Sequence, residues 1–189
     1  MHKLISIFLA LFIALILLTS CVKNSNEVYN LYFEDDLEWI NDKIDFIYSA
    51  MQNKNKDSLI SVFSSSALAS SPKLDADIEN MFELLDSDIV DYEKVEAYRT
   101  SKDSHQGNTS KVLVYKFYFY TDKEKYYCVI KECVFDNEDS GNIGVATIKI
   151  TNITNDEHRV SRGISDDDPF GLIINKTEES SISSNEETE

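Results

Sequence analysis

The chain has few basic side chains for its length. Its 189 residues include 18 lysines and arginines against 34 aspartates and glutamates, which gives a formal net charge of −16. Nucleic-acid backbones recruit basic side chains, so this balance argues against a nucleic-acid partner. The chain also has only three cysteines, too few for a fold built on disulfide bonds. It lacks a glycine-rich phosphate loop, a G-x-S-x-G nucleophile motif and an H-E-x-x-H metal motif, so we expect no cofactor and no metal.

One long apolar run stands near the start. Residues 4–18 are apolar apart from Ser6, and they follow Lys3. As a helix this run would span about 22 Å at about 1.5 Å per residue, whereas the hydrocarbon core of a bilayer is about 30 Å thick. The run is too short for a comfortable membrane span, and we expect a signal peptide over residues 1–20. The remaining length suits one domain with extensions, since domains most often have about 100–150 residues.

The residues that end this run resemble a bacterial lipobox. Leu18, Thr19 and Ser20 place one aliphatic and two small residues before Cys21. The resemblance implies cleavage between Ser20 and Cys21, diacylglycerol on the Cys21 sulfur and an acyl group such as palmitate on the new amine. Several acyl chains give lasting attachment to a membrane. The expected location is the extracytoplasmic side of the cell membrane, and the alternative is an uncleaved signal anchor with an incidental cysteine.

Without its leader the chain would be still more acidic. Removal of residues 1–20 takes away Lys3 and leaves 17 basic against 34 acidic residues, a net charge of −17. Anionic headgroups would repel such a chain, so the lipid on Cys21 would supply the contact with the membrane. Residues 21–34 are polar and show no period, and we expect a flexible spacer there.

Apolar residues at helical spacing follow the spacer. Between residues 35 and 51 they recur in steps of three and four, which predicts an amphipathic helix. They are Leu37, Ile40, Ile44, Ile47, Tyr48 and Met51. A short second helix is expected over 57–63, and the serines at 64–66 that follow weaken it at its end. A third helix is expected over 75–85.

After residue 88 the period changes to two, which indicates strands. We expect four of them, over 89–100, 111–120, 124–135 and 143–152. Residues 156–174 then form an extension, whose apolar patch at 169–174 is a candidate for docking on the domain. The segment 175–189 is expected to be disordered because it is rich in glutamate and serine.

The strand expected at 111–120 carries large apolar side chains on both faces. Val112, Val114, Tyr118 and Tyr120 alternate with Leu113, Tyr115, Phe117 and Phe119. A sheet with helices on one side only should show a polar second face. The second face is therefore expected to curve into a pocket or to be covered by the C-terminal segment or by a second copy of the chain, unless its aromatic rings are partly exposed.

The order of the expected elements and some short stretches of sequence resemble one known superfamily. Residues 51–59 (MQNKNKDSL), followed by Val62-Phe63-Ser64, resemble the opening of nuclear transport factor 2-like (cystatin-like) domains. With the lipobox and residues 139–145 (DSGNIGV), the chain resembles a family of uncharacterised Gram-positive bacterial lipoproteins with that fold. The resemblance implies an α+β domain over 35–155, in which N-terminal helices pack on a curved antiparallel sheet in a cone shape. It brings no active site with it.

The superfamily includes isomerases, cyclases and dehydratases that work inside the cone. Such a site needs a buried aspartate or histidine as base, and a tyrosine or protonated acid to stabilise an oxyanion. Four tyrosines are candidates for contacts in a pocket or on a sheet face: Tyr115, Tyr118, Tyr126 and Tyr127. The expected strands place no aspartate or histidine at mid-strand on the matching face. His105 falls in a polar loop, and His158 lies beyond the last strand.

The remaining candidate groups have the wrong spacing for binding sites. Cys128 and Cys133 lie on opposite faces of an expected strand and about 16 Å apart at about 3.3 Å per residue, whereas disulfide Cα atoms lie within about 7 Å. We expect free thiols, at least one of them buried. Residues 136–141 superficially resemble a calcium loop but lack the required ligand types, so we expect an acidic turn. The acidic run at 166–168 is expected to be solvated.

These features together predict a lipid-anchored, extracytoplasmic domain that binds or interacts without catalysis. Its partner would be an unknown protein or small ligand, contacted through the cone pocket or the aromatic sheet face. One alternative is a small-molecule enzyme of the isomerase or dehydratase type, which needs an acidic or histidine side chain inside the cone. Another alternative is a structural lipoprotein that forms a homodimer through the sheet face.

Overall fold

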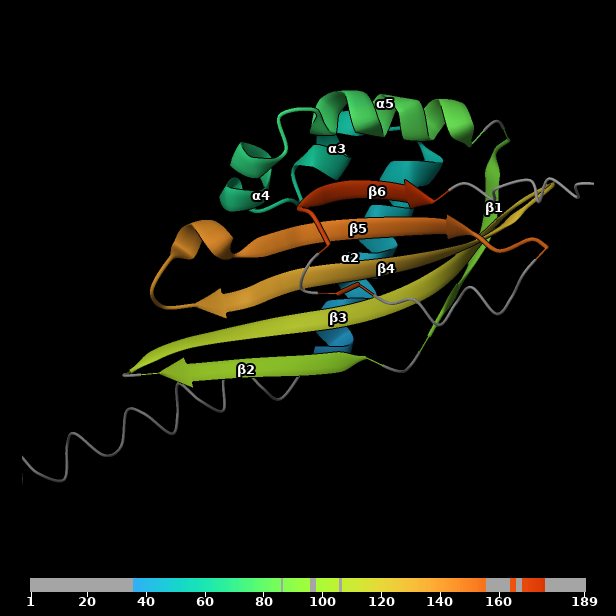
Figure 1. Cartoon of the computed structure of the whole chain (residues 1–189). Coiled ribbons are helices and arrows are strands. Elements are labelled where there is room, and N and C mark those ends of the chain that lie inside the picture. The colour runs from blue at the N-terminus through green and yellow to red at the C-terminus, as the bar shows by residue number, and fades with distance from the viewer. Residues whose placement is uncertain are drawn as a thin grey trace, which may run out of the picture. The chain divides into compact units, whose positions relative to one another are not determined.

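Helices come first in the chain and strands follow in the computed structural model (Figure 1), which describes residues 36–85, 87–95, 98–105, 107–155, 164–165 and 168–175. The helices are α2 (Asp36–Gln52), α3 (Lys56–Ile60), α4 (Ser65–Ser70), α5 (Leu74–Leu84) and the short 3-10 helix η1 (Ser140–Asn142). The strands are β1 (Ile89–Lys94), β2 (Arg99–His105), β3 (Asn108–Thr121), β4 (Lys125–Asp136), β5 (Gly144–Asn152) and β6 (Gly171–Asn175). The expected signal peptide 1–20, the spacer 21–34 with Cys21, and residues 176–189 lie outside the described residues, as does His158.

The helices at 36–52 and 74–84 confirm two of the three expected. From Ile40 onward the described residues belong to one compact unit, whereas residues 36–39 belong to another. In α2, Ile40, Ile44, Ile47 and Met51 are buried, as the steps of three and four require. α3 ends earlier than expected, at Ile60.

The serines after α3 begin a helix rather than only ending one. The Ser64 side chain accepts a hydrogen bond from the backbone N–H of Ala67 and thereby caps α4. A hydroxyl at this position satisfies a donor that the first helical turn leaves open. The same residue type that weakens a helix interior therefore starts α4, which the sequence pattern did not predict.

Six strands form one sheet in the order β1-β3-β4-β5-β6, and β2 also pairs with β3. The single strand expected at 89–100 is wrong. Two strands form instead, because β1 pairs with the second half of β3 and β2 pairs with its first half. His105 accordingly ends β2 rather than lying in a loop. The sheet is mixed rather than antiparallel throughout, because β6 runs parallel to β5.

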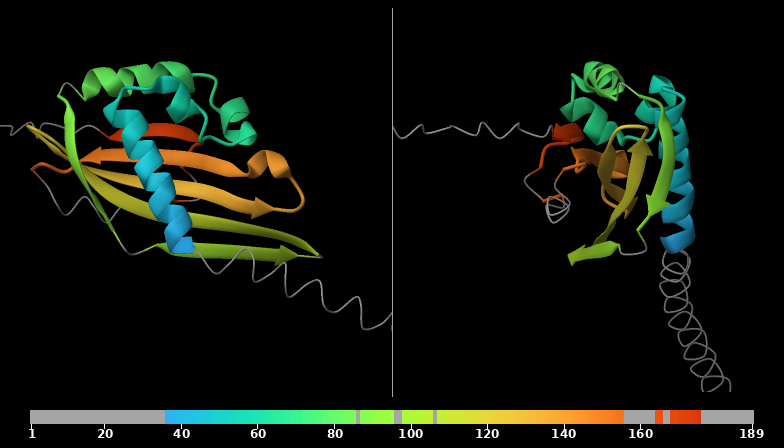
Figure 2. Two further views of the ribbon diagram at one scale, coloured as in Figure 1. Left: turned by 180° about the vertical axis from the view of Figure 1, so that it is seen from behind. Right: turned by 90° about the vertical axis from the view of Figure 1, so that its right-hand side faces the viewer.

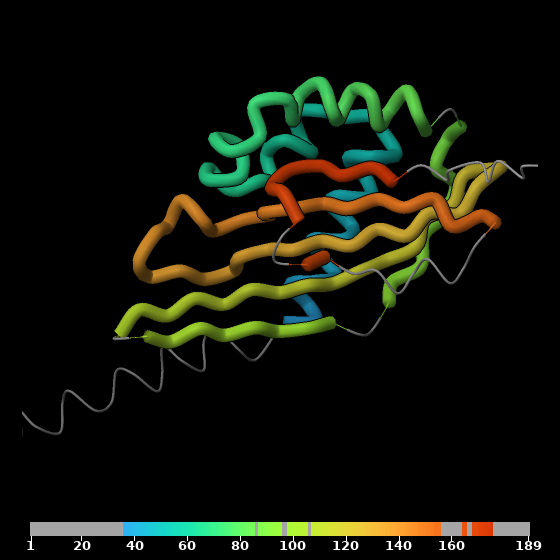
Figure 3. The backbone as a smooth tube through the Cα atoms, in the orientation of Figure 1, coloured from blue at the N-terminus to red at the C-terminus, as the bar shows by residue number. Residues whose placement is uncertain are grey.

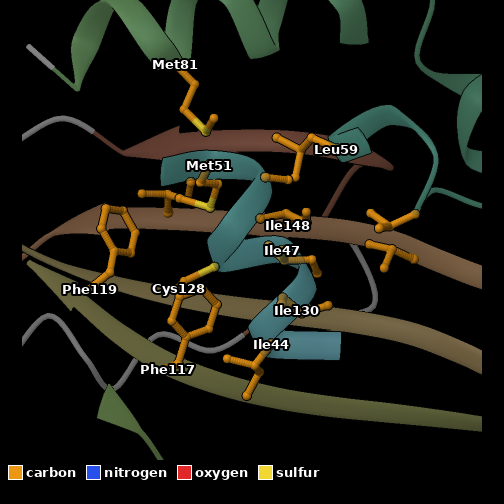
Figure 4. Packing of buried hydrophobic residues seen from close by; sticks show 14 of the residues in the cluster. Ile44, Ile47, Met51, Leu59, Met81, Phe117, Phe119, Cys128, Ile130 and Ile148 are labelled. Carbon is orange, nitrogen blue, oxygen red and sulfur yellow. The ribbon is translucent and has the colours of Figure 1, made fainter. Parts of the chain in front are cut away.

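The main core lies between the helices and one face of the sheet, which we call the helix-side face. Views from behind and from the side show α2 crossing the strands of this face (Figure 2). Phe117, Phe119 and Cys128 project from β3 and β4 toward the isoleucines of α2 (Figure 4). The alternation expected for 111–120 is confirmed, since Leu113, Tyr115, Phe117 and Phe119 are all buried there.

A tight backbone contact joins the helical segment to β5. The N–H of Ser64 donates to the carbonyl of Val145, and the N–H of Val145 donates to the carbonyl of Val62, each at 2.9 Å. Gly144 permits this approach, because a Cβ atom there would lie 3.0 Å from the Ser64 nitrogen and 3.2 Å from the Val62 oxygen. Its φ of +126° is also a conformation that favours glycine.

Replacing Gly144 by alanine is expected to lower the free energy of unfolding by about 2 kcal/mol, since it adds backbone strain and a backbone clash. Gly107→Ala is the matched control. Gly107 also has positive φ, at +89°, but a Cβ there would meet nothing within 4 Å. Urea denaturation of both variants measures the difference, and equal losses would show that the contact with Ser64 imposes no constraint.

The C-terminal extension covers part of the opposite face of the sheet, which we call the outer face. Ile164 packs there against Tyr127, Val129 and Ile153. Residues 164–165 lie on the side of the sheet away from α2, and the chain then continues into β6 (Figures 1 and 3). The C-terminal segment is one of the coverings expected for the second face of the sheet, and it covers part of that face in the structure. Residues 171–174 of the apolar patch expected at 169–174 pair with β5 as part of β6, whereas Phe170 is exposed.

Candidate functional site

A carboxylate is buried among apolar side chains on the helix-side face. Glu132 lies in β4, directly opposite Leu113 of β3, and only 1% of its side chain is exposed. The Tyr115 hydroxyl donates a hydrogen bond of 2.7 Å to its Oε2 atom. The ammonium group of Lys43, on α2, lies 3.2 Å from its Oε1 atom. These three residues form what we call the Glu132 cluster.

The position of each side chain in the Glu132 cluster follows from its element. Tyr115 is two residues from Leu113 along β3, so its side chain points to the same face and lies diagonally across from Glu132. Lys43 precedes the buried Ile44 in α2 and reaches the sheet from the edge of the helix, where its side chain is 23% exposed. The cluster therefore joins α2, β3 and β4, with its carboxylate inside and its ammonium group at the boundary.

The surroundings of Tyr115 in the Glu132 cluster favour its neutral phenol. Burial raises the pKa of Tyr115 well above its usual value, and the negative charge and hydrogen bond of Glu132 raise it further. A buried carboxylate is costly unless cations and hydrogen-bond donors compensate it. Lys43 and Tyr115 supply one of each, so the arrangement fixes Glu132 in place and links the helix to the sheet.

Tyr115 should contribute to a fall in stability at alkaline pH. Its pKa is raised by folding, so the stabilisation from its proton is fully present below the unfolded value of about 10 and is lost as the pH rises above it. Tyr115→Phe should cost about 1–2 kcal/mol at neutral pH through the lost hydrogen bond, and should flatten the alkaline decline. Chemical denaturation between about pH 8 and pH 11 tests this. An unchanged slope in the variant would contradict it.

The four tyrosines singled out from the sequence do not come together. Tyr115 and Tyr126 are on the helix-side face, where Tyr126 stacks on Phe119 with ring centroids 4.9 Å apart. The Tyr126 hydroxyl donates to Glu124, and burial and this carboxylate raise the pKa of the phenol. Tyr118 and Tyr127 are on the outer face instead and pair directly across β3 and β4. A single pocket lined by all four is therefore not what the structure shows.

The outer face carries lysines beside its aromatic rings. The Tyr118 and Tyr127 rings lie 5.2 Å apart. The Lys125 ammonium lies 4.9 Å from the centroid of Tyr118, and that of Lys116 lies 6.0 Å from the centroid of Tyr127. Such geometry allows attraction between a cation and a ring face. Burial of the phenol raises the pKa of Tyr127 to about 12, so its ring stays neutral at physiological pH.

The cysteines and the acidic turn have structural roles. Cys128 and Cys133 are free and buried, as expected, and burial raises the pKa of both thiols. The Asp136 carboxylate accepts from the backbone N–H groups of Glu138 and Asp139. Asp139 in turn accepts from Gly141 and caps η1. Among the described residues, no group of three or more histidines, cysteines or acids is placed to hold a metal ion.

Glu132 is not among the candidate residues expected from the sequence. The expected base is an aspartate or histidine at mid-strand, whereas the acid on the helix-side face is a glutamate. The two-residue spacing along β4 indicates its position, because Glu132 shares one face of the strand with Cys128, Ile130 and Val134. Lys111 carries a similar signal, as it continues the buried series of β3 and is itself fully buried.

Fold and site together define an α+β domain with helices on one face of a mixed six-stranded sheet and a buried Glu132 cluster. A family model described as a domain of unknown function (DUF5104) matches residues 46–155. The chain belongs to this family. The match begins within α2 and includes β1 to β5. No curated protein matches the chain. In the described part of the chain, no helix combines the length and the apolar character needed to cross a bilayer.

Proposed function

We propose that this protein is a lipid-anchored, extracytoplasmic binding module that carries out no catalysis. The observation that carries the proposal is the sequence Leu18-Thr19-Ser20-Cys21 at the end of a short apolar run. Acylated Cys21 would hold the domain at the cell membrane, and residues 21–34 would separate the two. The net charge of −17 expected after cleavage supports the need for a lipid, because charge alone would not attract this chain to anionic headgroups.

The domain itself is proposed to have the nuclear transport factor 2-like fold. The order of elements supports this, because α2, α3, α4 and α5 precede all six strands. The packing of α2 across long antiparallel strands also supports it. The finer claim of a cone-shaped sheet is part of the proposal.

The contact surface is proposed to be the exposed part of the outer face. Two tyrosines and two lysines are only partly buried there, namely Tyr118, Tyr120, Lys116 and Lys125. Tyrosine supplies a ring for apolar contact and a hydroxyl for hydrogen bonding, and lysine supplies a positive charge on a long apolar stem. This combination suits recognition of a polar or acidic partner. The helix-side face, in contrast, is filled by the main core.

Mass spectrometry of the protein from a bacterial membrane fraction tests the lipid anchor. We expect a mature chain that begins at acylated Cys21. Cys21→Ala should shift nearly all of the protein from the membrane to the soluble fraction, because no other lipid attachment is expected. Cys133→Ser is the matched control and should leave the fractionation unchanged. An unmodified Met1 or an unacylated Cys21 in the native protein would refute the anchor.

An isomerase or dehydratase remains the second candidate function, because Glu132 and Tyr115 supply an acid and a phenol in contact. The ion pair of Glu132 with Lys43 supports the structural interpretation instead. Proton exchange next to the carbonyl of small ketones and aldehydes, followed by NMR in deuterated water, separates the two. The non-catalytic proposal expects equal exchange with the native protein and with Glu132→Gln. Exchange that depends on Glu132 would favour the enzyme.

A further inference from the structure

Four lysines of β3, β4 and β5 lie on the outer face of an acidic chain. Lys116 of β3 and Lys149 of β5 both pair with Val129 of β4, so they lie on either side of it. Lys131 is two residues further along β4 and therefore points to the same face. Lys125 lies at the other end of β4, beside Tyr118. We call these four lysines, with Tyr118 and Tyr127, the lysine–tyrosine face.

Two carboxylates already lie on the lysine–tyrosine face or at its edge: that of Glu93, which pairs directly with Tyr118, and that of Asp168 in the C-terminal extension. Oδ2 of Asp168 is 3.2 Å from the Lys149 ammonium group. The backbone N–H of Ser165, the ion pair with Lys149 and the charge of Lys131 together lower the pKa of Asp168. Four residues earlier, Ile164 packs on Tyr127 and Val129. The C-terminal extension thus shows which chemistry this face accepts, namely an acidic side chain on the lysines and an apolar one between them.

The chain leaves β6 at the border of this face. Asn175 is the last residue of β6, and its side-chain amide donates to the Thr151 hydroxyl at 3.3 Å. Thr151 pairs directly with Tyr127 of the lysine–tyrosine face. Residues 176–189 continue from this point and contain five glutamates and one lysine. At about 3.3 Å per residue they reach about 46 Å, whereas β3 is three strand spacings, about 14 Å, from β6.

We propose that the acidic segment 176–189 docks on the lysine–tyrosine face of its own domain. Its glutamates would contact Lys116, Lys125 and Lys131, and Ile182 would lie against the tyrosine rings, as Ile164 does nearby. The tether makes this contact intramolecular, which raises the effective concentration of the acidic groups. Because this is the surface that the proposed binding function uses, the inference rests on that function for its biological meaning. An external partner then has to displace the segment.

A zero-length carbodiimide cross-linker on the full mature chain tests the docking directly, since it joins carboxylates only to amines in contact. Peptide mass spectrometry should find the glutamates of 176–189 joined to Lys116, Lys125 or Lys131 at least about fivefold more often than to Lys73. Lys73 is the matched control. It is exposed and follows Ser71, which donates to the Phe170 carbonyl beside β6, so the same tether also reaches it.

A variant of the full chain and a change of salt concentration complete the test. Changing the five glutamates to aspartate should preserve the cross-links at the lysine–tyrosine face, because aspartate keeps the carboxylates that the reagent joins to amines. Salt of about 1 M should reduce these cross-links to the level at Lys73, because it shortens the screening length to about 3 Å. Equal yields at Lys73 and at the three lysines would overturn the proposal. Cross-links found only between two copies would overturn docking within one chain and would assign the face to self-association. Neither result bears on the lipid at Cys21.

Discussion

Replacing Lys43 by methionine is expected to lower the free energy of unfolding by about 3 kcal/mol, a large effect for a residue with a partly exposed side chain. The substitution keeps the length of the side chain but removes the ammonium group 3.2 Å from the Glu132 carboxylate. That carboxylate is 1% exposed, so water does not replace the lost charge. Urea denaturation followed by circular dichroism measures the loss.

Two further variants identify the cause of this loss. Lys54→Met changes an exposed lysine in the turn after α2 and should cost little. Glu132→Gln combined with Lys43→Met removes the buried charge together with its partner, and it should recover a large part of the stability lost in the single variant. If Lys43→Met costs no more than Lys54→Met, the Glu132 cluster does not join α2 to the sheet as we describe.

Replacing Phe117 by alanine should cost about 4 kcal/mol, because it removes a fully buried ring and leaves a cavity in the main core. Phe117 lies on the helix-side face, where Tyr92 meets its ring edge-on with centroids 6.5 Å apart. Tyr118 is its neighbour in β3 but lies on the outer face and is only partly buried.

Tyr118→Ala is the matched control for this prediction. It removes a ring from the same strand, one residue away, and should cost about 1–2 kcal/mol because its ring keeps some contact with water. The difference between the two variants therefore measures which face each residue occupies. Similar losses at 117 and 118 would mean that β3 is buried equally on both faces, against the alternating burial along this strand.

Periodicity predicted the elements whose side chains alternate simply, and tertiary pairing decided the others. The steps in α2 and the two-residue alternation in β3 are present in the sequence, and both elements appear where expected. β4 also appears where expected, although its residues 126–130 are all buried and do not alternate in burial. The break between β1 and β2 was not foreseen. It depends on where each segment pairs along β3, which local composition does not encode. The parallel pairing of β6 depends likewise on a contact between distant segments.

The Glu132 cluster shows a different limit of sequence reasoning. The alternation places Glu132 on the helix-side face, but nothing local says that Lys43, almost ninety residues earlier, provides its counter-charge. The candidate tyrosines, in contrast, are grouped by residue type although they do not lie together in the structure. Tyr126 and Tyr127 are adjacent in sequence and similar in chemistry, yet a strand sends them to opposite faces. The residue type alone therefore identifies four candidate tyrosines, whereas the strand register decides which face of the sheet each one occupies.

The short pairing of β6 has a consequence for local opening of the sheet. β6 lies at the edge of the sheet and pairs with β5 alone, through five residue pairs. Its Leu172 and Ile174 side chains are only partly buried against the main core. An element with few backbone hydrogen bonds and few buried apolar contacts opens at a lower free energy than the rest of a domain. We therefore expect β6 to open before β3 separates from β4, and its opening would uncover the backbone edge of β5.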